Sequence, residues 1–322
     1  MFENTSNVES PQGGASTQKE STIDKLPKVF RGADEIKNLD IKNINYLVDK
    51  LIPRGTLCAL VGESDTGKSS LLRQLGVSIA YGDENFIGFK LNSGCGNVLY
   101  VSTEDGEMGT SVWLNKHFGE DSSDDELLSK LNFAFSTDGI VKNLRESVIN
   151  QCIDLIIVDS YADIFSGSMN NSNEVRMFLQ QYASIASEFN VTVIFLHHTK
   201  KSSAGQRPNK NNILGSQGFE AKMRSVLMLT KDTKDDSLRH LCVVKNNYMD
   251  EKNKGESYVL KFNSQLSFEN TGERVSLNEL GDEEYMVRAR ELKEAGSSYR
   301  EIEKILKDEG FKTSSSTIQR KM

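Results

Sequence analysis

The sequence predicts an α/β core with a mostly parallel central sheet and antiparallel C-terminal strands, followed by a small all-α unit. Apolar runs of strand length alternate with amphipathic helical segments as far as Leu196. This alternation requires right-handed crossovers between parallel strands. Two later apolar runs, 241–244 and 258–262, have no helix between them and are expected to be antiparallel strands. From residue 284 onward the apolar spacing is helical throughout.

The composition limits the classes of protein to consider. With 322 residues the chain can form a sizeable core and one small extra domain. Its hydrophobic fraction of 37% and charged fraction of 26% are those of an ordinary soluble protein. The formal charge of −7 gives no whole-chain signature of nucleic-acid binding, so such a partner would have to be held locally.

Cysteine usage and hydropathy indicate a compartment. The cysteines lie far apart and form no C-x-x-C pair, so neither a zinc site nor a disulfide framework is expected; they are Cys58, Cys95, Cys152 and Cys242. The N-terminus lacks a signal peptide's apolar segment, and no apolar run approaches the ~20 residues of a membrane span. We therefore expect a cytoplasmic protein in a reducing environment, without a membrane partner.

The chain divides into five expected segments. Residues 1–25 are rich in Ser, Thr, Asn, Gln and Gly and predict a disordered tail. Residues 26–52 carry spaced apolar side chains that we expect to pack on the edge of the core or on a neighbouring subunit. The remaining segments are the core (53–268), a linker (269–282) and the C-terminal unit (283–322).

A glycine-rich loop between a strand and a helix is the most informative motif. The strand is expected over 57–61, and the loop and helix start read G-x-x-x-x-G-K-S. The glycines let backbone N–H groups face a polyphosphate, Lys68 supplies a cation for the β- and γ-phosphates, and the Ser69 hydroxyl can bind Mg²⁺. The alternative is an ordinary glycine-rich turn. The residues expected to bind ATP are Gly62, Glu63, Ser64, Asp65, Thr66, Gly67, Lys68, Ser69 and Ser70.

Two further apolar strands end in acidic residues. The run 97–105 delivers Glu104 to its C-terminal end, where open α/β sheets bind ligands, so Glu104 is a candidate base that activates water. The run 153–160 ends in Asp159, which can hold the Mg²⁺ shell. The alternatives are a solvated acidic turn at Glu104 and an acidic strand cap at Asp159.

The strand 191–196 leads into His197-His198-Thr199-Lys200, where a neutral histidine or the threonine could donate to a γ-phosphate. No third ligand at a metal spacing accompanies the histidines, which argues against zinc. The loop that follows is basic and almost free of apolar residues, so it could track a phosphate backbone or be merely exposed to solvent. Its cations are Lys200, Lys201, Arg207 and Lys210.

The C-terminal unit has the spacing of three helices: residues 284–295, a second around Tyr299 and Leu306, and a third over 317–322. This pattern suits a helix-turn-helix DNA reader. From Tyr285 to Met322 nine Lys/Arg stand against six Asp/Glu, a net charge of +3. A simple helical hairpin is the alternative, and the sequence ends inside the third helix, which leaves open whether this unit is truncated.

Six motifs in this order resemble the RepA-type branch of the RecA-like ATPases, which includes ring-shaped hexameric helicases that replicate plasmids and other mobile elements. The resemblance covers roughly residues 44–262 and implies a RecA-like core, ATP and Mg²⁺ as cofactors, a homo-hexamer and a DNA partner. The matching stretches are 52–55, 62–69, 99–105, 157–160, 197–200 and 245–248.

The resemblance also implies roles for single residues. Glu104 matches the catalytic glutamate, Asp159 the Walker B acid and His198 the γ-phosphate sensor. Arg224 aligns with an arginine finger offered to the neighbouring subunit, with Lys245 as a companion. The related DnaB-like helicases carry an arginine two places after that lysine, where this chain has asparagine, so the choice among Lys222, Arg224 and Lys245 stays open.

Two functions from different classes follow. The first is an ATP-hydrolysing DNA motor, a helicase, that binds DNA through the loop 200–210 and the C-terminal unit. The second is an ATP-gated DNA-binding regulator or a recombination or transposition accessory that unwinds nothing. A small-molecule kinase is disfavoured because no second substrate pocket or lid is legible in the sequence.

Overall fold

The computed structural model describes residues 30–119, 125–200, 203, 206–280 and 284–322. The tail expected over 1–25 lies outside these residues. The chain separates into two compact units, residues 1–44 and 45–322. No helix in the described ranges is both long and apolar enough to cross a membrane.

Within the first unit the structure describes residues 30–44. Its helix α1 (Ala33–Lys37) has no buried residue. Large apolar side chains nearby are exposed, namely Phe30, Ile36, Leu39, Ile41 and Ile44. The segment 26–52 was expected to pack on the core or on a neighbouring subunit, and its last residues, from 45 onward, belong to the second unit. There β1 (Tyr46–Val48) pairs with β2 (Ile52–Pro53), and Leu47 and Leu51 are buried.

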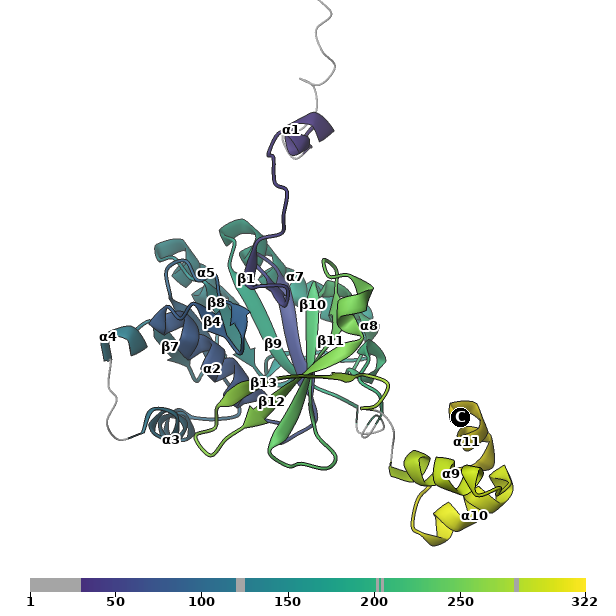
Figure 1. The fold of residues 1–322 in the computed structure, drawn as a ribbon. Coiled ribbons are helices and arrows are strands. Elements are labelled where there is room, and N and C mark those ends of the chain that lie inside the picture. Colours follow the sequence, from purple (N-terminus) through teal and green to yellow (C-terminus); the bar gives the residue numbers. More distant parts are fainter. Residues whose placement is uncertain (1–29, 120–124, 201–202, 204–205, 281–283) are drawn as a thin grey trace, which may run out of the picture. The chain divides into compact units, whose positions relative to one another are not determined.

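A nine-stranded sheet in the order β13-β12-β11-β10-β3-β9-β8-β6-β7 forms the centre of the second unit (Figure 1). The strands from β10 to β7 pair parallel, and β10 to β13 pair antiparallel, which confirms the predicted mixed sheet. The strands are β3 (Leu57–Gly62), β6 (Val98–Ser102), β7 (Leu131–Ala134), β8 (Leu155–Asp159), β9 (Thr192–His198), β10 (Ser225–Lys231), β11 (Leu238–Asn246), β12 (Glu256–Phe262) and β13 (Phe268–Ser276); a separate hairpin joins β4 (Asn85–Phe86) and β5 (Phe89–Lys90).

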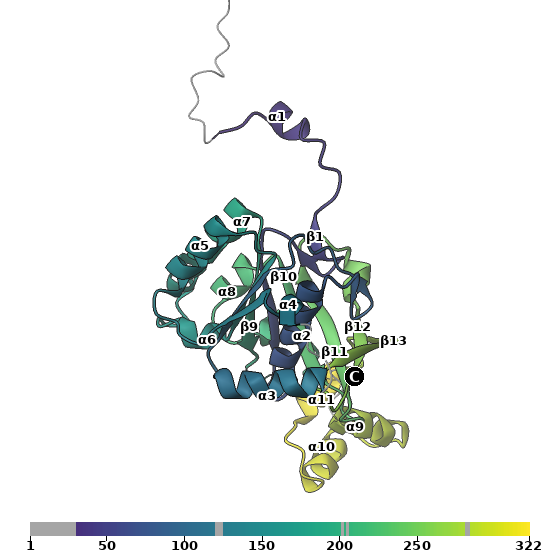
Figure 2. The same cartoon turned by 90° about the vertical axis from the view of Figure 1, so that its left-hand side faces the viewer.

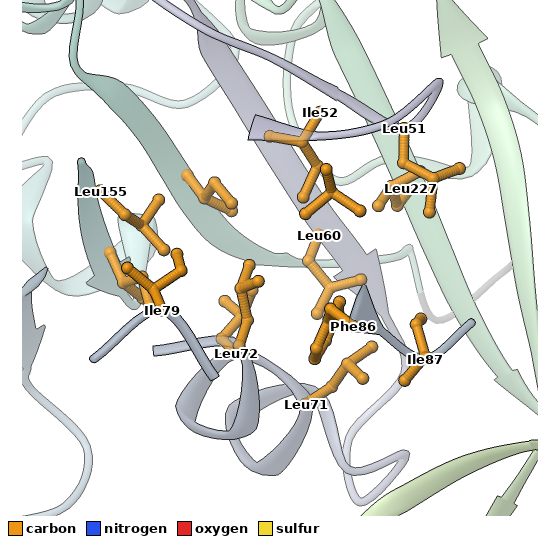
Figure 3. Close-up of a cluster of buried hydrophobic side chains, with 14 of the residues drawn as sticks. Leu51, Ile52, Leu60, Leu71, Leu72, Ile79, Phe86, Ile87, Leu155 and Leu227 are labelled. Atoms are coloured by element: carbon orange, nitrogen blue, oxygen red, sulfur yellow. The ribbon is translucent and has the colours of Figure 1, made fainter. Parts of the chain in front are cut away.

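Helices cover both faces of this sheet (Figure 2). The helices over one face are α2 (Lys68–Tyr81), α3 (Glu107–Phe118) and α4 (Asp125–Leu128); over the other they are α5 (Ile140–Asn150), α6 (Tyr161–Ile164), α7 (Ser172–Phe189) and α8 (Gln217–Lys222). Because neighbouring strand residues point to opposite faces, Leu60 packs in the first layer and Val61 in the second. Figure 3 shows Leu71, Leu72 and Ile79 of α2 in the first layer. The central strands are buried on both sides, which explains their continuous apolar runs.

The prediction of a linker over residues 269–282 is wrong for its first part, because residues 269–276 belong to strand β13. Its backbone pairs with β12, with Lys261 opposite Glu269 and Glu256 opposite Ser276. The Arg274 guanidinium also lies 3.9 Å from the centre of the Tyr258 ring. An edge strand with mostly exposed, polar side chains carries no alternation for sequence reasoning to detect, since backbone hydrogen bonds hold it.

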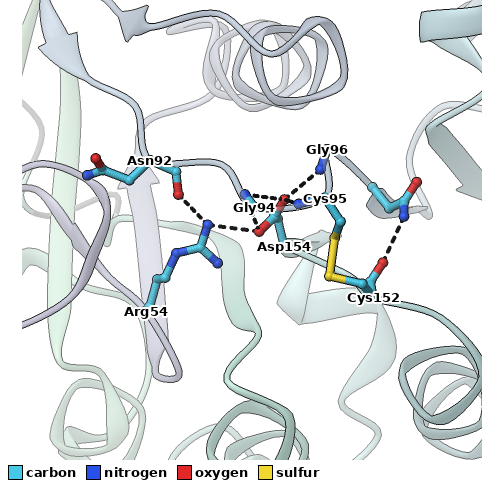
Figure 4. The surroundings of a disulfide bond; sticks show 8 residues. Arg54, Asn92, Gly94, Cys95, Gly96, Cys152 and Asp154 are labelled. Carbon is cyan, nitrogen blue, oxygen red and sulfur yellow. Dashed lines mark hydrogen bonds and ion pairs between the residues drawn. A yellow bond between two sulfur atoms is a disulfide. The ribbon is translucent and has the colours of Figure 1, made fainter.

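The cysteine expectation is also wrong, because Cys95 and Cys152 form a disulfide with their Cα atoms 6.1 Å apart (Figure 4). Parallel pairing of β6 with β8 brings together two residues 57 positions apart in the sequence. The Asp154 carboxylate holds the same corner, accepting hydrogen bonds from the N–H groups of Gly94, Cys95 and Gly96. Cys58 and Cys242 are buried free thiols. The reducing compartment inferred from isolated cysteines therefore loses that support.

The C-terminal unit contains α9 (Glu284–Glu294), α10 (Tyr299–Asp308) and α11 (Ser315–Lys321). A capping box joins Ser298 and Glu301 at the start of α10, and the Ser314 hydroxyl caps α11. The three helices share a small apolar core of Tyr285, Met286, Ala289, Ile302, Leu306 and Ile318. Two 3₁₀ turns complete the described elements, η3 (Lys210–Asn212) and η4 (Glu251–Lys254).

Breaking the disulfide with Cys152→Ser should lower the free energy of unfolding by up to about 4 kcal/mol, because the bond closes a long loop in the unfolded chain. Denaturant unfolding without reductant measures this. Alkylation of the denatured, unreduced wild-type chain should modify Cys58 and Cys242 alone. Modification of Cys95 and Cys152 in that sample would contradict the assignment.

Candidate active site

The loop between β3 and α2 has the backbone geometry of a phosphate cradle. Gly67, the N-cap residue of α2, lies in the left-handed region with φ of 92° and supplies no side-chain cap. A Cβ at this position would lie 2.7 Å from the Phe268 ring, so the site needs glycine. The uncapped N–H groups at the start of α2 are available to an anion, and the helix dipole favours negative charge there.

Lys68 is the buried cation of this loop. It is 5% exposed, and its Nζ donates to the Glu63 carbonyl at 2.6 Å. Burial lowers the pKa of Lys68, while the nearby negative charges of Glu104 and Asp159 oppose that shift. The ammonium is thus partly desolvated and surrounded by carboxylates, a position in which added phosphate charge would be attracted strongly.

Parallel pairing brings the predicted site residues to one edge of the sheet. Gly62 at the end of β3 pairs with His198 of β9, and Ser102 of β6 pairs with Asp159 of β8. The ends of these strands open on a cavity of about 370 Å³. The cavity is lined by Ser64, Asp65, Gly67, Lys68, Ser69, Ser70, Glu104, Leu196 and His198. This is the carboxyl edge at which open α/β sheets bind ligands.

Asp159 is buried beside the cavity and is only partly satisfied. It is 2% exposed, its Oδ2 accepts a hydrogen bond of 2.6 Å from the Tyr100 hydroxyl, and its Oδ1 has no partner in the described part of the chain. Burial raises the pKa of Asp159, and the hydroxyls of Tyr100 and Ser69 oppose the rise. A free carboxylate oxygen near the Ser69 hydroxyl is the hard oxygen donor set that Mg²⁺ prefers, so these residues fit the ion.

Glu104 and His198 lie side by side on the wall of the cavity. His198 Nε2 lies 3.5 Å from Glu104 Oε1, and the Glu104 side chain is 48% exposed. A carboxylate that reaches both solvent and the phosphate cradle can orient water or accept its proton.

The adjacent His197 has a different environment from that of His198. Burial lowers its pKa to about 4, and its Nε2 donates to the Leu214 carbonyl at 3.0 Å. Its ring packs against those of Tyr161 and Phe219. Of the two histidines, the neutral His197 is part of the core and His198 is the one on the cavity.

Arg224 and Lys245 are not brought to this site. Arg224 precedes β10 at the level of Leu57, at the opposite end of the sheet from Lys68, and is exposed. Lys245 pairs with Glu220 at 2.8 Å near the same end. In the basic loop, Lys200 donates to the Asn211 carbonyl and Arg207 is exposed, whereas Lys201 lies outside the described residues.

The sequence indicated no role for three residues around the carboxylates, Arg73, Tyr100 and Asp105, although Asp105 was expected beside Glu104 at the end of its strand. Arg73 of α2 pairs with Asp105, which follows Glu104, and Tyr100 donates to Asp159. The available signal was a charged residue between the leucines of the helix after the glycine-rich loop. The hydrogen bond of Tyr100 left no signal, because the residue sits inside a continuous strand pattern.

The fold and the site together define a P-loop ATPase with a RecA-like core. The strand, glycine-rich loop and helix form the phosphate cradle, and the carboxylates of two further strands stand at its mouth. A family model described as an AAA domain, AAA_25, matches residues 23–204, and the chain belongs to this family.

Solved structures resemble parts of this chain. One of them, described as an ATPase domain, shares the fold and superposes with a TM-score of 0.56 at 15% identity, covering 74% of this chain and 95% of that one. The RadB recombinase structure gives a TM-score of 0.49 at 19% identity, covering 68% and 91%. No curated protein matches the chain.

If Glu104 is the base that the sequence predicts, Glu104→Gln should lower the kcat of ATP hydrolysis by roughly 10²–10⁴. ATP binding should persist, since Lys68 and the loop are unchanged. Steady-state hydrolysis and binding of a fluorescent ATP analogue measure the two effects. Glu107→Gln on the exposed start of α3 is the matched control. Equal loss of turnover in both variants would contradict the assignment.

Proposed function

We propose that this protein is an ATP-hydrolysing DNA motor that works as a homo-oligomer and resembles the RepA-type replicative helicases of plasmids and other mobile elements. The observation that carries the proposal is the meeting of Glu104 and His198 with Lys68 on one cavity, beside Asp159. A group able to activate water beside the lysine supports hydrolysis rather than nucleotide binding alone. The similar solved structure described as an ATPase domain is in keeping with the same reaction.

Each residue has a part in the proposed reaction. Lys68 and the N–H groups of α2 bind the β- and γ-phosphates. Ser69 and Asp159 would hold Mg²⁺, which would neutralise phosphate charge. Glu104 orients a water molecule and takes its proton as the oxygen attacks the γ-phosphorus. The bond between that phosphorus and the bridging oxygen breaks, and ADP leaves. His198, beside Glu104, responds to the γ-phosphate.

The position of Arg224 supports a site shared between subunits, and the family resemblance favours a hexamer. Among the described residues that line the cavity, Lys68 is the lone lysine or arginine. Arg224 is exposed at the far end of the same sheet, where it cannot reach its own cavity. We therefore assign it to the cavity of a neighbouring subunit, as an arginine finger that stabilises charge in the transition state.

In this proposal two basic regions bind DNA. A DNA partner also implies a cytoplasmic location. The loop 200–210 follows β9 directly after His198, so strand β9 joins a γ-phosphate contact to a loop that could track a DNA backbone. Residues 285–322 carry a net charge of +3, and the last helix of the C-terminal unit exposes Gln319 and Arg320. This arrangement supports contacts of α11 with duplex DNA.

A mixing experiment tests the shared site. Arg224→Ala and Glu104→Gln chains should each lose most hydrolysis, roughly 10³-fold or more for the arginine. Mixed in equal amounts they should regain activity, because some sites then combine Glu104 of one chain with Arg224 of the other. Arg176→Ala, an exposed arginine of α7, serves as the control and should keep wild-type activity. A mixture no more active than its two components would refute the assignment.

The second function, an ATP-gated DNA-binding regulator, is favoured by one observation. The C-terminal helices have their own small core, as a separate duplex reader would. Forked DNA with ATP separates the two functions. If the protein is a motor, the wild-type chain should release the strand and Lys68→Met should not. Lys142→Met, a change on the exposed surface of α5, should leave strand release intact. Binding of the duplex without release, weakened by Arg320→Ala, would replace the motor with the regulator.

A further inference from the structure

Arg73 is a buried cation to which the proposed reaction assigns no role. It lies on α2, in the same helix as Lys68, and its side chain is 4% exposed. Its Nη2 lies 2.6 Å from Asp105 Oδ2, and the Asp105 side chain is 48% exposed. The ion pair therefore joins the helix that follows the phosphate cradle to the turn that carries Glu104.

Aromatic rings fix the arginine in place. Its Cζ lies 5.7 Å from the centre of the Tyr100 ring and 5.8 Å from that of Trp113. A planar, weakly hydrated guanidinium suits such a site better than an ammonium does. Tyr100 in turn donates its hydroxyl to Asp159. One cation thus contacts side chains from β6 and α3, both of which are next to the carboxylates of the site.

Stability alone does not account for this arginine. Burying a guanidinium costs free energy that an apolar side chain at the same place would not cost. Arg73 Nε also has no hydrogen-bond partner among the described residues, a further cost. Burial lowers the pKa of Arg73, but Tyr100, Asp105 and Asp159 outweigh that effect and keep it charged.

The turn that carries Glu104 depends on Asp105. The Asp105 carbonyl accepts a hydrogen bond of 2.7 Å from the Ser102 hydroxyl, and its carboxylate is held by Arg73. Glu104 itself is held loosely, by the 3.5 Å contact with His198. The direction of the Glu104 side chain is therefore set by the residues on either side of it.

We propose that Arg73 is a positioning residue that fixes the Glu104 turn against α2 through its ion pair with Asp105. The inference deepens the proposed ATP hydrolysis and depends on it. Loss of the pair displaces the base from the attacking water while the phosphate cradle stays intact. A misplacement of about 1 Å can cost on the order of 10² in rate.

Steady-state kinetics of Asp105→Asn, Arg73→Met and the double variant test the proposal. Each single change should lower kcat about tenfold or more, with the KM for ATP changed by less than about threefold. The double variant should be no slower than the slower single variant, because the two residues act as one unit. Arg73→Lys should recover part of the rate, since an ammonium can pair with Asp105 but stacks poorly on the rings.

Arg145→Met is the matched control, because Arg145 of helix α5 also pairs with a carboxylate, that of Glu188, and lies over the ring of Phe189. It should leave kcat unchanged. Thermal unfolding of every variant separates loss of fold from loss of rate, and the half-exposed Asp105 gives a variant that should fold even where Arg73→Met does not.

The possible outcomes are distinct. If the wild-type chain hydrolyses ATP but Asp105→Asn keeps its kcat within about twofold, the inference is overturned and the proposed function stands. Additive losses in the double variant, or a loss confined to KM, overturn it as well. A wild-type chain that shows no turnover, alone or with DNA, refutes the proposed function and this inference with it.

Discussion

The attraction between one buried ammonium and the carboxylates around it is the constraint on which the rest of this structure depends. Lys68 is desolvated at the start of α2, and Asp159 is desolvated at the end of β8. Each charge is costly to bury alone, and each offsets part of the cost of the other. A polyphosphate with Mg²⁺ fits the same field, because the ion can take the free oxygen of Asp159 while phosphate oxygens face the ammonium.

The sheet makes this arrangement possible. Parallel strands β3, β9, β8 and β6 are neighbours, so their carboxyl ends meet without long loops. Buried layers on both faces fix the strand positions, and Tyr100 and Arg73 add polar contacts next to the carboxylates. The cavity opens where strand ends meet, and the disulfide corner by Asp154 lies at the opposite ends of β6 and β8. Chemistry and reinforcement therefore occupy opposite edges of the sheet.

The sequence predicted those parts of the site that depend on local pattern or on strand direction. The glycine-rich loop at Lys68 is a local motif, and Glu104 and Asp159 follow apolar strands whose parallel pairing decides where they end. Other features depend on partners distant in the sequence. Arg73 finds Asp105 through tertiary packing, Cys95 finds Cys152 through the pairing of β6 with β8, and β13 has a polar pattern typical of a linker. Arg224 marks a different limit, since its proposed partner belongs to another copy of the chain.

The most direct measurement is a structure of the oligomer with a non-hydrolysable ATP analogue and Mg²⁺. The account predicts the γ-phosphate within about 3 Å of Lys68 Nζ, the hydrogen-bond distance of a charged pair, with Glu104 one water molecule away. It further predicts Mg²⁺ beside Ser69 and Asp159. An analogue bound away from Lys68, or a Glu104 side chain turned out of the cavity in the bound state, would contradict it.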